Sequence, residues 1–398
     1  MTWPVVKLGS LITDERSGAS LKKDQFTDAG VGVVPKKAIS ESVDLLTDTL
    51  VYTSENIYHS STSAQVDDKF LITTLRNLNP DGSTLGLICR HEHDDKLMLA
   101  QGMYAFRLSN DISPDYLCFA SRTPSFREQI QKIKVGSTQV HIRAKEFKEI
   151  EIPLPPLAEQ QRIAAILDKA DAIRRKRQQA NQLADDFLRA VFLDMFGDPV
   201  TNPKDWEVKP LGECLKFLTS GSRGWAKYYS ETGSKFIRIQ NVSKNKLLID
   251  DMAFVTAPDG AEATRTKVRL DDVLLSITAD LGRSSVVTDE IVGGHINQHL
   301  ALLRLDTETL NPRYLSAYLS SDAGVRQFER KNKSAVKAGL NFTDIKTLEI
   351  MVPSIEKQAE YQKLYEKLTS NETKRIDSDL LLTTVFDALS QKAFRGEL

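Results

Sequence analysis

The ten residues Glu146–Pro155, EFKEIEIPLP, occur again 198 positions further along the chain as Asp344–Pro353, DIKTLEIMVP. Both copies read acidic, apolar, Lys, any residue, apolar, Glu, Ile, any residue, aliphatic, Pro. A match of this length indicates an internal duplication. A duplication has to be recognised before anything else because every later assignment depends on it.

The duplication extends toward the N-terminal side of both copies. Trp3–Gly9 has the pattern Trp-x-Val-x-x-Leu-Gly, and Trp206–Gly212 repeats it at an offset of 203. Between these anchors, Tyr116 corresponds to Tyr314 at the offset of 198. Loop insertions produce such small changes of offset, so the repeat spans nearly the whole chain.

A stretch without Pro or Gly follows each copy of the motif. The first runs from 157 to 196, which predicts a helix of about 40 residues and roughly 60 Å. Phe196–Pro199 ends it with a Gly stop followed by a Pro. The second helix is expected to begin after Pro353, with Ser354 as its N-cap, and to end at Gly396.

Apolar residues recur in both stretches at a heptad-like spacing. The predicted seam of the first helix is Ile163, Ile166, Ala170, Ile173, Ala180, Ala184, Phe187 and Val191. The predicted seam of the second is Tyr361, Leu364, Leu368, Leu382, Val385 and Leu389. The two seams are in register at the offset of 198, so we expect an intramolecular antiparallel coiled coil. Two unrelated surface helices on separate cores are the alternative.

The segments between the helices are predicted to be α/β (α+β) domains. Short β-branched runs such as Phe236–Ile239 and Val273–Ile277 alternate with Gly, Asn and Asp turns. The predicted organisation is a globular domain over 1–154, a long central helix over 155–197, a second globular domain over 198–353, and a long C-terminal helix over 354–398.

The composition is that of a globular chain without biased tracts. Of 398 residues, 41% are hydrophobic and 27% charged, and no apolar run reaches the ~18 residues that a membrane span needs. Three cysteines far apart favour reduced thiols over disulfides. The start Met1–Pro4 has no basic-then-apolar export pattern, so we expect a cytoplasmic protein.

The net charge argues against a stand-alone nucleic-acid binder, which is usually basic. Lys and Arg total 53 against 54 Asp and Glu, a formal net charge of −1. A chain of this kind that meets DNA must segregate its charge onto one face or rely on a partner to hold the phosphates. The basic run Arg174–Arg177 on the first helix has two interpretations: a solvated face, or a contact with a partner or the DNA backbone.

One motif suggests catalysis, and the duplication removes it. Asn311–Tyr314, NPRY, resembles the Asn-Pro-Pro-Tyr loop with which adenine-N6 methyltransferases hold the amino group. The equivalent residues of the first copy are Ser113–Tyr116, SPDY. The shared content is therefore a helix N-cap, a Pro in the first turn and a core Tyr.

Other signatures of enzymes are missing or isolated. His91–Asp95, HEHDD, lacks the helical spacing of metal ligands and has no counterpart in the second copy, which favours a solvated loop. The chain has no phosphate-binding Gly-x-x-x-x-Gly-Lys-Ser/Thr loop and no Gly-x-Ser-x-Gly elbow. We therefore predict no catalytic residues, no metal site and no enzyme activity of the chain's own.

Polar loops remain, and they differ between the copies. Arg, Lys, Asn, Gln, Ser and Thr supply the donors and acceptors that read base edges and bind phosphates. In the first copy the candidate DNA-binding residues are Lys36, Lys37, Thr74, Arg76, Asn77, Lys134, Ser137, Thr138, Gln139, His141 and Arg143. In the second copy they are Arg238, Gln240, Asn241, Thr278, Arg283, Ser284, Lys331, Lys333, Lys337 and Asn341.

The sequence resembles the specificity (S) subunit of type I restriction-modification systems. Pro153–Ile163, PLPPLAEQQRI, looks like the Pro-rich start of that family's long helices, and Met195–Pro199, MFGDP, looks like the end of the first one. The second copy, Met351–Gln358, reads MVPSIEKQ and keeps only part of the motif. The resemblance covers the whole chain.

The resemblance implies a non-catalytic subunit with two target recognition domains, each reading one half of a bipartite double-stranded DNA site. The helical pair would set the gap between the halves and dock two modification (methyltransferase) subunits, and restriction/translocase subunits would complete the enzyme. S-adenosylmethionine, Mg²⁺ and ATP are expected on those partners, and no membrane contact is expected. The residues expected to contact modification subunits are Glu159, Gln160, Arg162 and Gln358.

Two other classes of function stay open from the sequence. The chain is an adaptor whose two heads bind proteins, with the helices as a spacer, or it is a self-sufficient restriction enzyme. The adaptor predicts no preference for any DNA sequence. The self-sufficient enzyme predicts cleavage or methylation by the purified chain alone.

Overall fold

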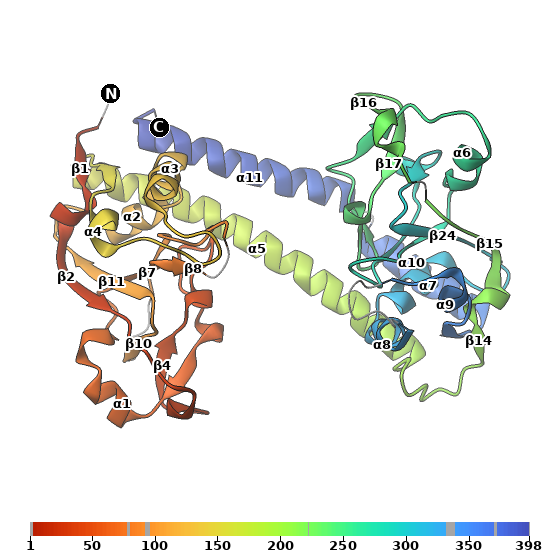
Figure 1. Ribbon diagram of the computed structural model, residues 1–398, viewed down its shortest axis with the longest axis horizontal. Helices are drawn as coiled ribbons and strands as arrows, with labels where there is room; N and C mark the ends of the chain where they lie inside the picture. Colours follow the sequence, from red (N-terminus) through yellow and green to blue (C-terminus); the bar gives the residue numbers. More distant parts are fainter. Residues whose placement is uncertain are drawn as a thin grey trace. The chain divides into compact units, whose positions relative to one another are not determined.

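The computed structural model describes residues 3–77, 80–91, 96–221, 223–331, 339–369 and 372–397, with the side chains of 372–380 left out. The chain forms two compact units (Figure 1). Unit 1 comprises Met1–Gln178 and Lys374–Leu398, and unit 2 comprises Gln179–Thr373. The helix α5 (Leu157–Phe196) runs through the boundary, so each unit contains one half of it.

Unit 1 contains thirteen short strands and four helices besides its share of the long ones. The strands are β1 (Val5–Lys7), β2 (Ile12–Ser17), β3 (Phe26–Thr27), β4 (Val31–Val34), β5 (Val51–Thr53), β6 (Gln65–Val66), β7 (Leu71–Thr74), β8 (Arg76–Asn77), β9 (Ile88–Cys89), β10 (Leu97–Leu99), β11 (Met103–Leu108), β12 (Val140–His141) and β13 (Glu151–Pro153) among the described residues. The helices are α1 (Glu55–Ser60), α2 (Pro114–Ala120), α3 (Pro124–Ile133) and α4 (Ala144–Lys148).

Unit 2 repeats this inventory with small differences. Its strands are β14 (Val208–Pro210), β15 (Leu215–Ser220), β16 (Tyr229–Ser230), β17 (Ser234–Ile237), β18 (Val242–Ser243), β19 (Lys246–Leu247), β20 (Ala253–Val255), β21 (Val273–Ser276), β22 (Ser284–Val286), β23 (His295–Ile296), β24 (Leu300–Leu305) and β25 (Glu349–Met351). Its helices are α6 (Ala261–Thr266), α7 (Pro312–Leu319), α8 (Asp322–Lys331), α9 (Phe342–Lys346) and α10 (Ile355–Thr369).

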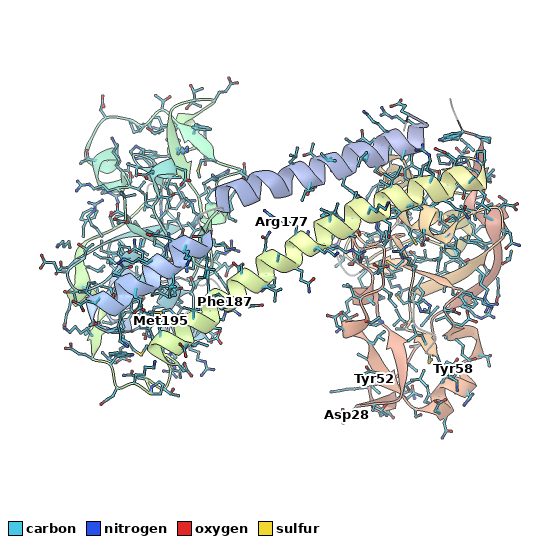
Figure 2. The ribbon with its side chains drawn as sticks, turned by 180° about the vertical axis from the view of Figure 1, so that it is seen from behind. Asp28, Tyr52, Tyr58, Arg177, Phe187 and Met195 are labelled. Carbon is cyan, nitrogen blue, oxygen red and sulfur yellow. The ribbon has the colours of Figure 1, made fainter. Side chains whose placement is uncertain are left out.

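The sheets of the two units have the same topology. The order β2-β11-β7-β9 in unit 1 matches β15-β24-β21-β22 in unit 2, and both sheets are antiparallel. In a second sheet β4 runs parallel to β10, as β17 runs parallel to β23. In unit 1 this second sheet reaches the end that lies away from α5, where Tyr52 and Tyr58 are labelled (Figure 2). The predicted mixed fold and its duplication are confirmed.

The long helices pack in an antiparallel way inside each unit. In unit 1, Leu167 of α5 shares a core with Phe386 and Ala393 of α11 (Glu372–Arg395). In unit 2, the ring of Phe192 of α5 lies 5.5 Å from that of Tyr361 of α10. Two helices, α10 and α11, therefore stand where one C-terminal helix was predicted, and residues 370 and 371 lie outside the described part. None of the described helices is long and apolar enough to cross a membrane.

The predicted heptad seam is wrong in the middle of α5 and along much of its partner. Ile173 and Phe187 keep 55% and 54% of their surface exposed. The side chains that are buried instead are Leu167, Leu188 and Phe192 on α5, Tyr365 on α10 and Phe386 on α11. Leu364, Leu368, Val385 and Ala180 are also exposed. A straight helix drifts away from a strict seven-residue repeat, and here each half packs a broad face on a globular core.

A buried glutamine joins each globular part to its long helix. The Gln160 side chain of α5 is fully buried, and its amide donates to the carbonyls of Pro155 (2.8 Å) and Asp111 (3.0 Å). The same side chain accepts the main-chain N–H of Ser113 (2.8 Å), at the start of α2. One side-chain amide therefore bonds three main-chain groups: the carbonyl of the Pro turn, a loop carbonyl and the N–H of the residue that caps α2.

Unit 2 repeats this arrangement atom for atom. The Gln358 amide donates to the carbonyls of Pro353 (2.7 Å) and Thr309 (3.2 Å) and accepts the N–H of Asn311 (2.8 Å). Both glutamines were expected to contact modification subunits. Their full burial gives them an internal role instead, because every polar atom of the side chain is bonded to the chain itself.

The Asn-Pro-Arg-Tyr segment is a helix start, as the duplication indicated. The Asn311 side chain accepts the N–H of Arg313 and Tyr314 as the N-cap of α7. The buried Tyr314 hydroxyl donates to the Met351 carbonyl at 2.9 Å, and Tyr116 makes the equivalent 2.8 Å bond to Pro153. Burial raises the pKa of both phenols.

Replacing Gln160 with Ala should lower the free energy of unfolding of unit 1 by about 3 kcal/mol, because three buried main-chain groups lose their partner. The neighbouring, exposed Gln161→Ala is the matched control and should change stability by less than about 0.5 kcal/mol. Denaturant midpoints of the full chain measure both. Equal midpoints for the two variants would contradict the role given to Gln160.

Candidate nucleic-acid interface

Two residues of the basic run Arg174–Arg177 on α5 form ion pairs inside unit 1. Arg174 pairs with the buried carboxylate of Asp171 at 2.7 Å, and its guanidinium lies 4.8 Å from the ring centroid of Phe386. Arg175 pairs with Asp171 at 3.1 Å and also with Asp44 of the globular part. These two arginines therefore make ion pairs inside unit 1 and hold α5 to the core and to α11, while a contact of the basic run with a partner or the DNA backbone stays a prediction.

A third arginine, Arg90, which the sequence analysis did not single out, connects three separate parts of unit 1. Arg90 binds the carboxylates of Asp44 (2.8 Å), Asp115 of α2 (2.6 Å) and Asp168 of α5 (2.7 Å). Its side chain is only 19% exposed. Because Asp44 also contacts Arg175, the charges form one network that fixes the globular part of unit 1 on the first half of α5.

The network should make the stability of unit 1 depend on pH. Burial alone would raise the pKa of Asp44, but Arg90 and Arg175 outweigh it and hold the pKa below its ordinary value of 3.8. A carboxylate with a lowered folded-state pKa stabilises the fold above its ordinary pKa. That contribution is lost as the pH falls through the folded-state value.

Arg90→Met should therefore destabilise unit 1 by about 2 kcal/mol at neutral pH, since hydrogen bonds to charged groups are lost. The difference from the unchanged protein should shrink as the pH falls through the lowered folded-state pKa of Asp44, which lies below 3.8. Hydrogen exchange of the α2 and α5 amides across this pH range measures it. The exposed pair of Lys132 and Glu128 provides the control, because Lys132→Met should have little effect. A pH-independent loss for Arg90→Met would argue against the network.

The structure brings two of the predicted loops of unit 1 together. Strands β8 and β12 form a two-stranded antiparallel ribbon in which Arg76 lies opposite His141 and Asn77 opposite Val140. Arg76 is exposed on this ribbon. The β12 side of the ribbon also carries three exposed predicted residues, Ser137, Thr138 and Gln139.

Other predicted residues of unit 1 are bonded to their own chain. Asn77 donates to Thr84 (3.0 Å), and Lys134 donates to the carbonyls of Pro80 (3.3 Å) and Asp81 (3.2 Å). Arg143 is exposed and pairs with Glu146 at 3.2 Å. Thr74 is fully buried, so it is removed from the interface.

Lys36 and Lys37 begin a short 3-10 helix (Lys36–Ala38) directly after β4. Lys37 is exposed, and Lys36 is half-buried beside Gly102, at the turn before β11. Gly102 has a φ of +88° and no side chain, which leaves room for its neighbours. Burial, and then the nearby charge of Arg76, lowers the pKa of Lys36.

In unit 2 the same position holds a hydroxyl, an imidazole and an amide. The Thr278 hydroxyl lies 2.6 Å from Nδ1 of His299, and Nε2 of His299 lies 3.1 Å from the Gln298 amide. Thr278 is bridged to Gly339, as Arg76 is paired with His141 in unit 1. The sequence analysis missed Gln298 and His299. Their position just before the central strand, equivalent to that of Gly102, would have indicated them.

The remaining predictions in unit 2 divide into exposed and internal residues. Arg238 and Gln240 converge on Asp251, each at 3.0 Å from its carboxylate. Arg283 pairs with Asp280, Lys331 donates to Thr347 (2.8 Å), and Asn341 caps α9. Asn241 and Ser284 are buried and bonded internally, so they are removed from the interface. Lys333 and Lys337 lie outside the described residues.

Glu159 and Arg162, predicted to contact a partner, lie on the first turn and a half of α5. They pair with each other at 2.8 Å, and Arg162 is exposed. Their contact with a modification subunit stays a prediction.

The fold and this site define a class of protein in which one domain framework occurs twice and carries different polar groups at equivalent places. A family model described as "Type I restriction modification DNA specificity domain" matches residues 1–184 and 203–378. The chain belongs to this family.

Individual relatives agree with the family assignment. The chain is 24% identical over 311 residues to the EcoBI specificity subunit of Escherichia coli, covering 70% of this chain and 65% of that protein. It is 26% identical over 326 residues to the StySPI specificity subunit of Salmonella potsdam, covering 74% and 67%. It is 24% identical over 407 residues to the EcoKI specificity subunit of E. coli K12, covering 95% and 81%. The first of these alignments thus spans less than two thirds of the relative's length.

A solved structure shares the fold. The crystal structure of a type I restriction-modification S subunit from M. genitalium aligns with a TM-score of 0.60 at 16% identity, covering 99% of this chain and 96% of that one. At this identity the likeness concerns the fold alone.

Proposed function

We propose that this chain is the DNA-specificity subunit of a type I restriction-modification enzyme. Each unit reads one half of a split double-stranded sequence and catalyses no reaction itself. The observation that carries the proposal is the contrast between the two units. Their internal bonds repeat, as at Gln160 and Gln358, while the polar groups at equivalent places differ, as at the exposed Arg76 and the half-buried Thr278. Two domains that bind different half-sites need the same internal framework and different contact residues.

The low net charge fits a reader that works inside a larger complex. Phosphate contacts supply most of the salt-dependent affinity of DNA-binding proteins. A chain with a formal net charge of −1 supplies little of that affinity over its whole surface. We infer that the modification subunits provide much of the phosphate neutralisation, along with S-adenosylmethionine and the methyl transfer. Restriction/translocase subunits would bring ATP and Mg²⁺.

The long helices are the proposed docking surface for the modification subunits. Large apolar side chains are exposed on them in both units: Ile173, Leu183, Phe187 and Leu193 on α5, Leu364 and Leu368 on α10, and Leu381 and Val385 on α11. Figure 2 shows Phe187 on α5, two turns before the half-buried Met195. Exposed apolar side chains on these long helices support a protein contact there.

A competition experiment tests the proposal against the adaptor and the self-sufficient enzyme. The full chain, alone and with its modification subunit, is mixed with labelled duplex and challenged with unlabelled random or cognate duplex at several salt concentrations. We expect cognate DNA to compete at least a thousandfold better than random DNA when the modification subunit is present. The purified chain with Mg²⁺ and S-adenosylmethionine should neither cut nor methylate DNA. Equal competition by both duplexes would support the adaptor, and activity of the chain alone would support the enzyme.

We further propose that the helices set the gap between the half-sites. Four residues inserted after Arg177 and again after Arg375 would lengthen each helix by about 6 Å and slightly more than one turn. This length corresponds to about one to two base pairs of duplex. Methylation mapping with the inserted protein should show a longer gap and unchanged half-sites. An unchanged gap with an altered half-site would contradict the spacing role.

A further inference from the structure

We propose that Lys36 and Arg76 together bind a guanine in the half-site read by unit 1. The inference rests on the proposed function and deepens it by naming a base and the side chains that recognise it. Guanine presents two acceptors, O6 and N7, on its major-groove edge, and Arg and Lys are the side chains that most often bind them.

Both side chains lie beside one glycine, Gly102. A Cβ atom placed on Gly102 would lie 2.9 Å from Cε of Lys36 and 3.1 Å from Cβ of Arg76. The glycine therefore leaves the space that both side chains occupy. The Thr74 hydroxyl, which is buried, donates to the main-chain carbonyl of Arg76 at 2.8 Å and holds the start of the ribbon in place. Thr74 is thus a positioning residue for Arg76.

The pair has no counter-charge in the part of the chain that the structure describes. No ion pair joins Lys36 or Arg76 to a carboxylate among those residues, although exposed cations elsewhere in unit 1, such as Arg143 and Lys132, have acidic partners. Two cations held together without an acid repel each other, and this cost is recovered when an electron-rich group binds between them. The lowered pKa of Lys36, caused by burial and by Arg76, is consistent with a site that awaits such a group.

The equivalent place in unit 2 shows that the pair is not part of the common framework. The Leu75 N–H donates to the Gly102 carbonyl at 3.0 Å, and Ile277 makes the same 3.0 Å bond to His299. These matching bonds establish the equivalence of the two turns. With the strands in register, the counterparts of Arg76, Lys36 and Gly102 are Thr278, Ile239 and His299.

This difference favours a base over a phosphate as the bound group. Both units would need a phosphate contact, because both grip the same uniform backbone. A Lys–Arg pair in one unit and a hydrogen-bonded Thr278–His299–Gln298 chain in the other is expected where the groups read different bases. The two-stranded ribbon that carries Arg76 is also a shape that the major groove admits.

The test is a selection from a library of randomised DNA duplexes by the full chain with its modification subunits. The variants are Arg76→Gln, Lys36→Met and the double variant. The unchanged protein should select two fixed motifs separated by a gap. Arg76→Gln should reduce the preference for a G·C pair at one position of one motif by roughly 10-fold to 100-fold. The other motif should stay the same, which shows within the same pool that the protein is folded and active. Lys36→Met should relax the same position.

A matched control removes an equal charge elsewhere in unit 1. Lys132→Gln, on the exposed face of α3, should leave both motifs as they are. A phosphate contact gives a different result for Arg76→Gln: uniformly weaker binding, a salt slope smaller by about one, and both motifs unchanged. That result, or a relaxed position that is not a G·C pair, would overturn the guanine assignment while leaving the proposed function intact. Selection of no motif by the unchanged protein would instead overturn the proposed function.

Discussion

The buried amide of Gln160, repeated as Gln358, is the contact on which the rest of each unit depends. It lies where the globular part turns into the long helix and satisfies a Pro carbonyl, a loop carbonyl and the first N–H of another helix. A buried main-chain group without a partner is costly, so removing this amide would leave several such groups unsatisfied at the joint. This one side chain therefore links the start of each long helix to two other parts of its globular domain.

The two units share one part of what stabilises this joint and differ in another. Both pack aromatic rings there: the ring of Tyr116 lies 4.9 Å from that of Phe394 of α11 in unit 1, and the ring of Tyr314 lies 4.7 Å from that of Phe196 of α5 in unit 2. Unit 1 adds a network of Arg90 and Arg175 with carboxylates from a loop, α2 and α5. Ring packing tolerates changes of pH that titrate carboxylates, so the ion-pair network adds a pH-sensitive contribution to the joint of unit 1. The two copies thus keep the aromatic packing and differ in their charged contacts.

The sequence predicted much of what the duplication repeats, namely the mixed fold, the long helix α5 and the helix start at Asn311, but it gave the repeated Gln160 and Gln358 a partner contact where the structure buries them. It could not predict contacts between residues distant in the chain, such as Arg90 with Asp168, because no local pattern marks them. The heptad seam was misplaced at Ile173 and Phe187 because the helices pack on globular cores with a wider face than a coiled coil uses. Thr74, Asn241 and Ser284 were misassigned for a related reason. Polar residues at strand ends often serve their own backbone, and composition does not separate that role from DNA binding.

The polar side chains at the turns before β11 and β24 show how the repeated framework leaves room for the proposed recognition of two half-sites. A backbone bond of the same length holds both turns, so the side chains placed there can change without disturbing the strands. In unit 1 a glycine leaves room for two cations that come from other elements, whereas in unit 2 a histidine fills that room itself. Three equivalent positions differ together: Gly102, Lys36 and Arg76 in unit 1 correspond to His299, Ile239 and Thr278 in unit 2. Long charged side chains in one unit thus take the place of a compact chain of hydrogen bonds in the other, which is the kind of difference that the proposed reading of two different half-sites requires.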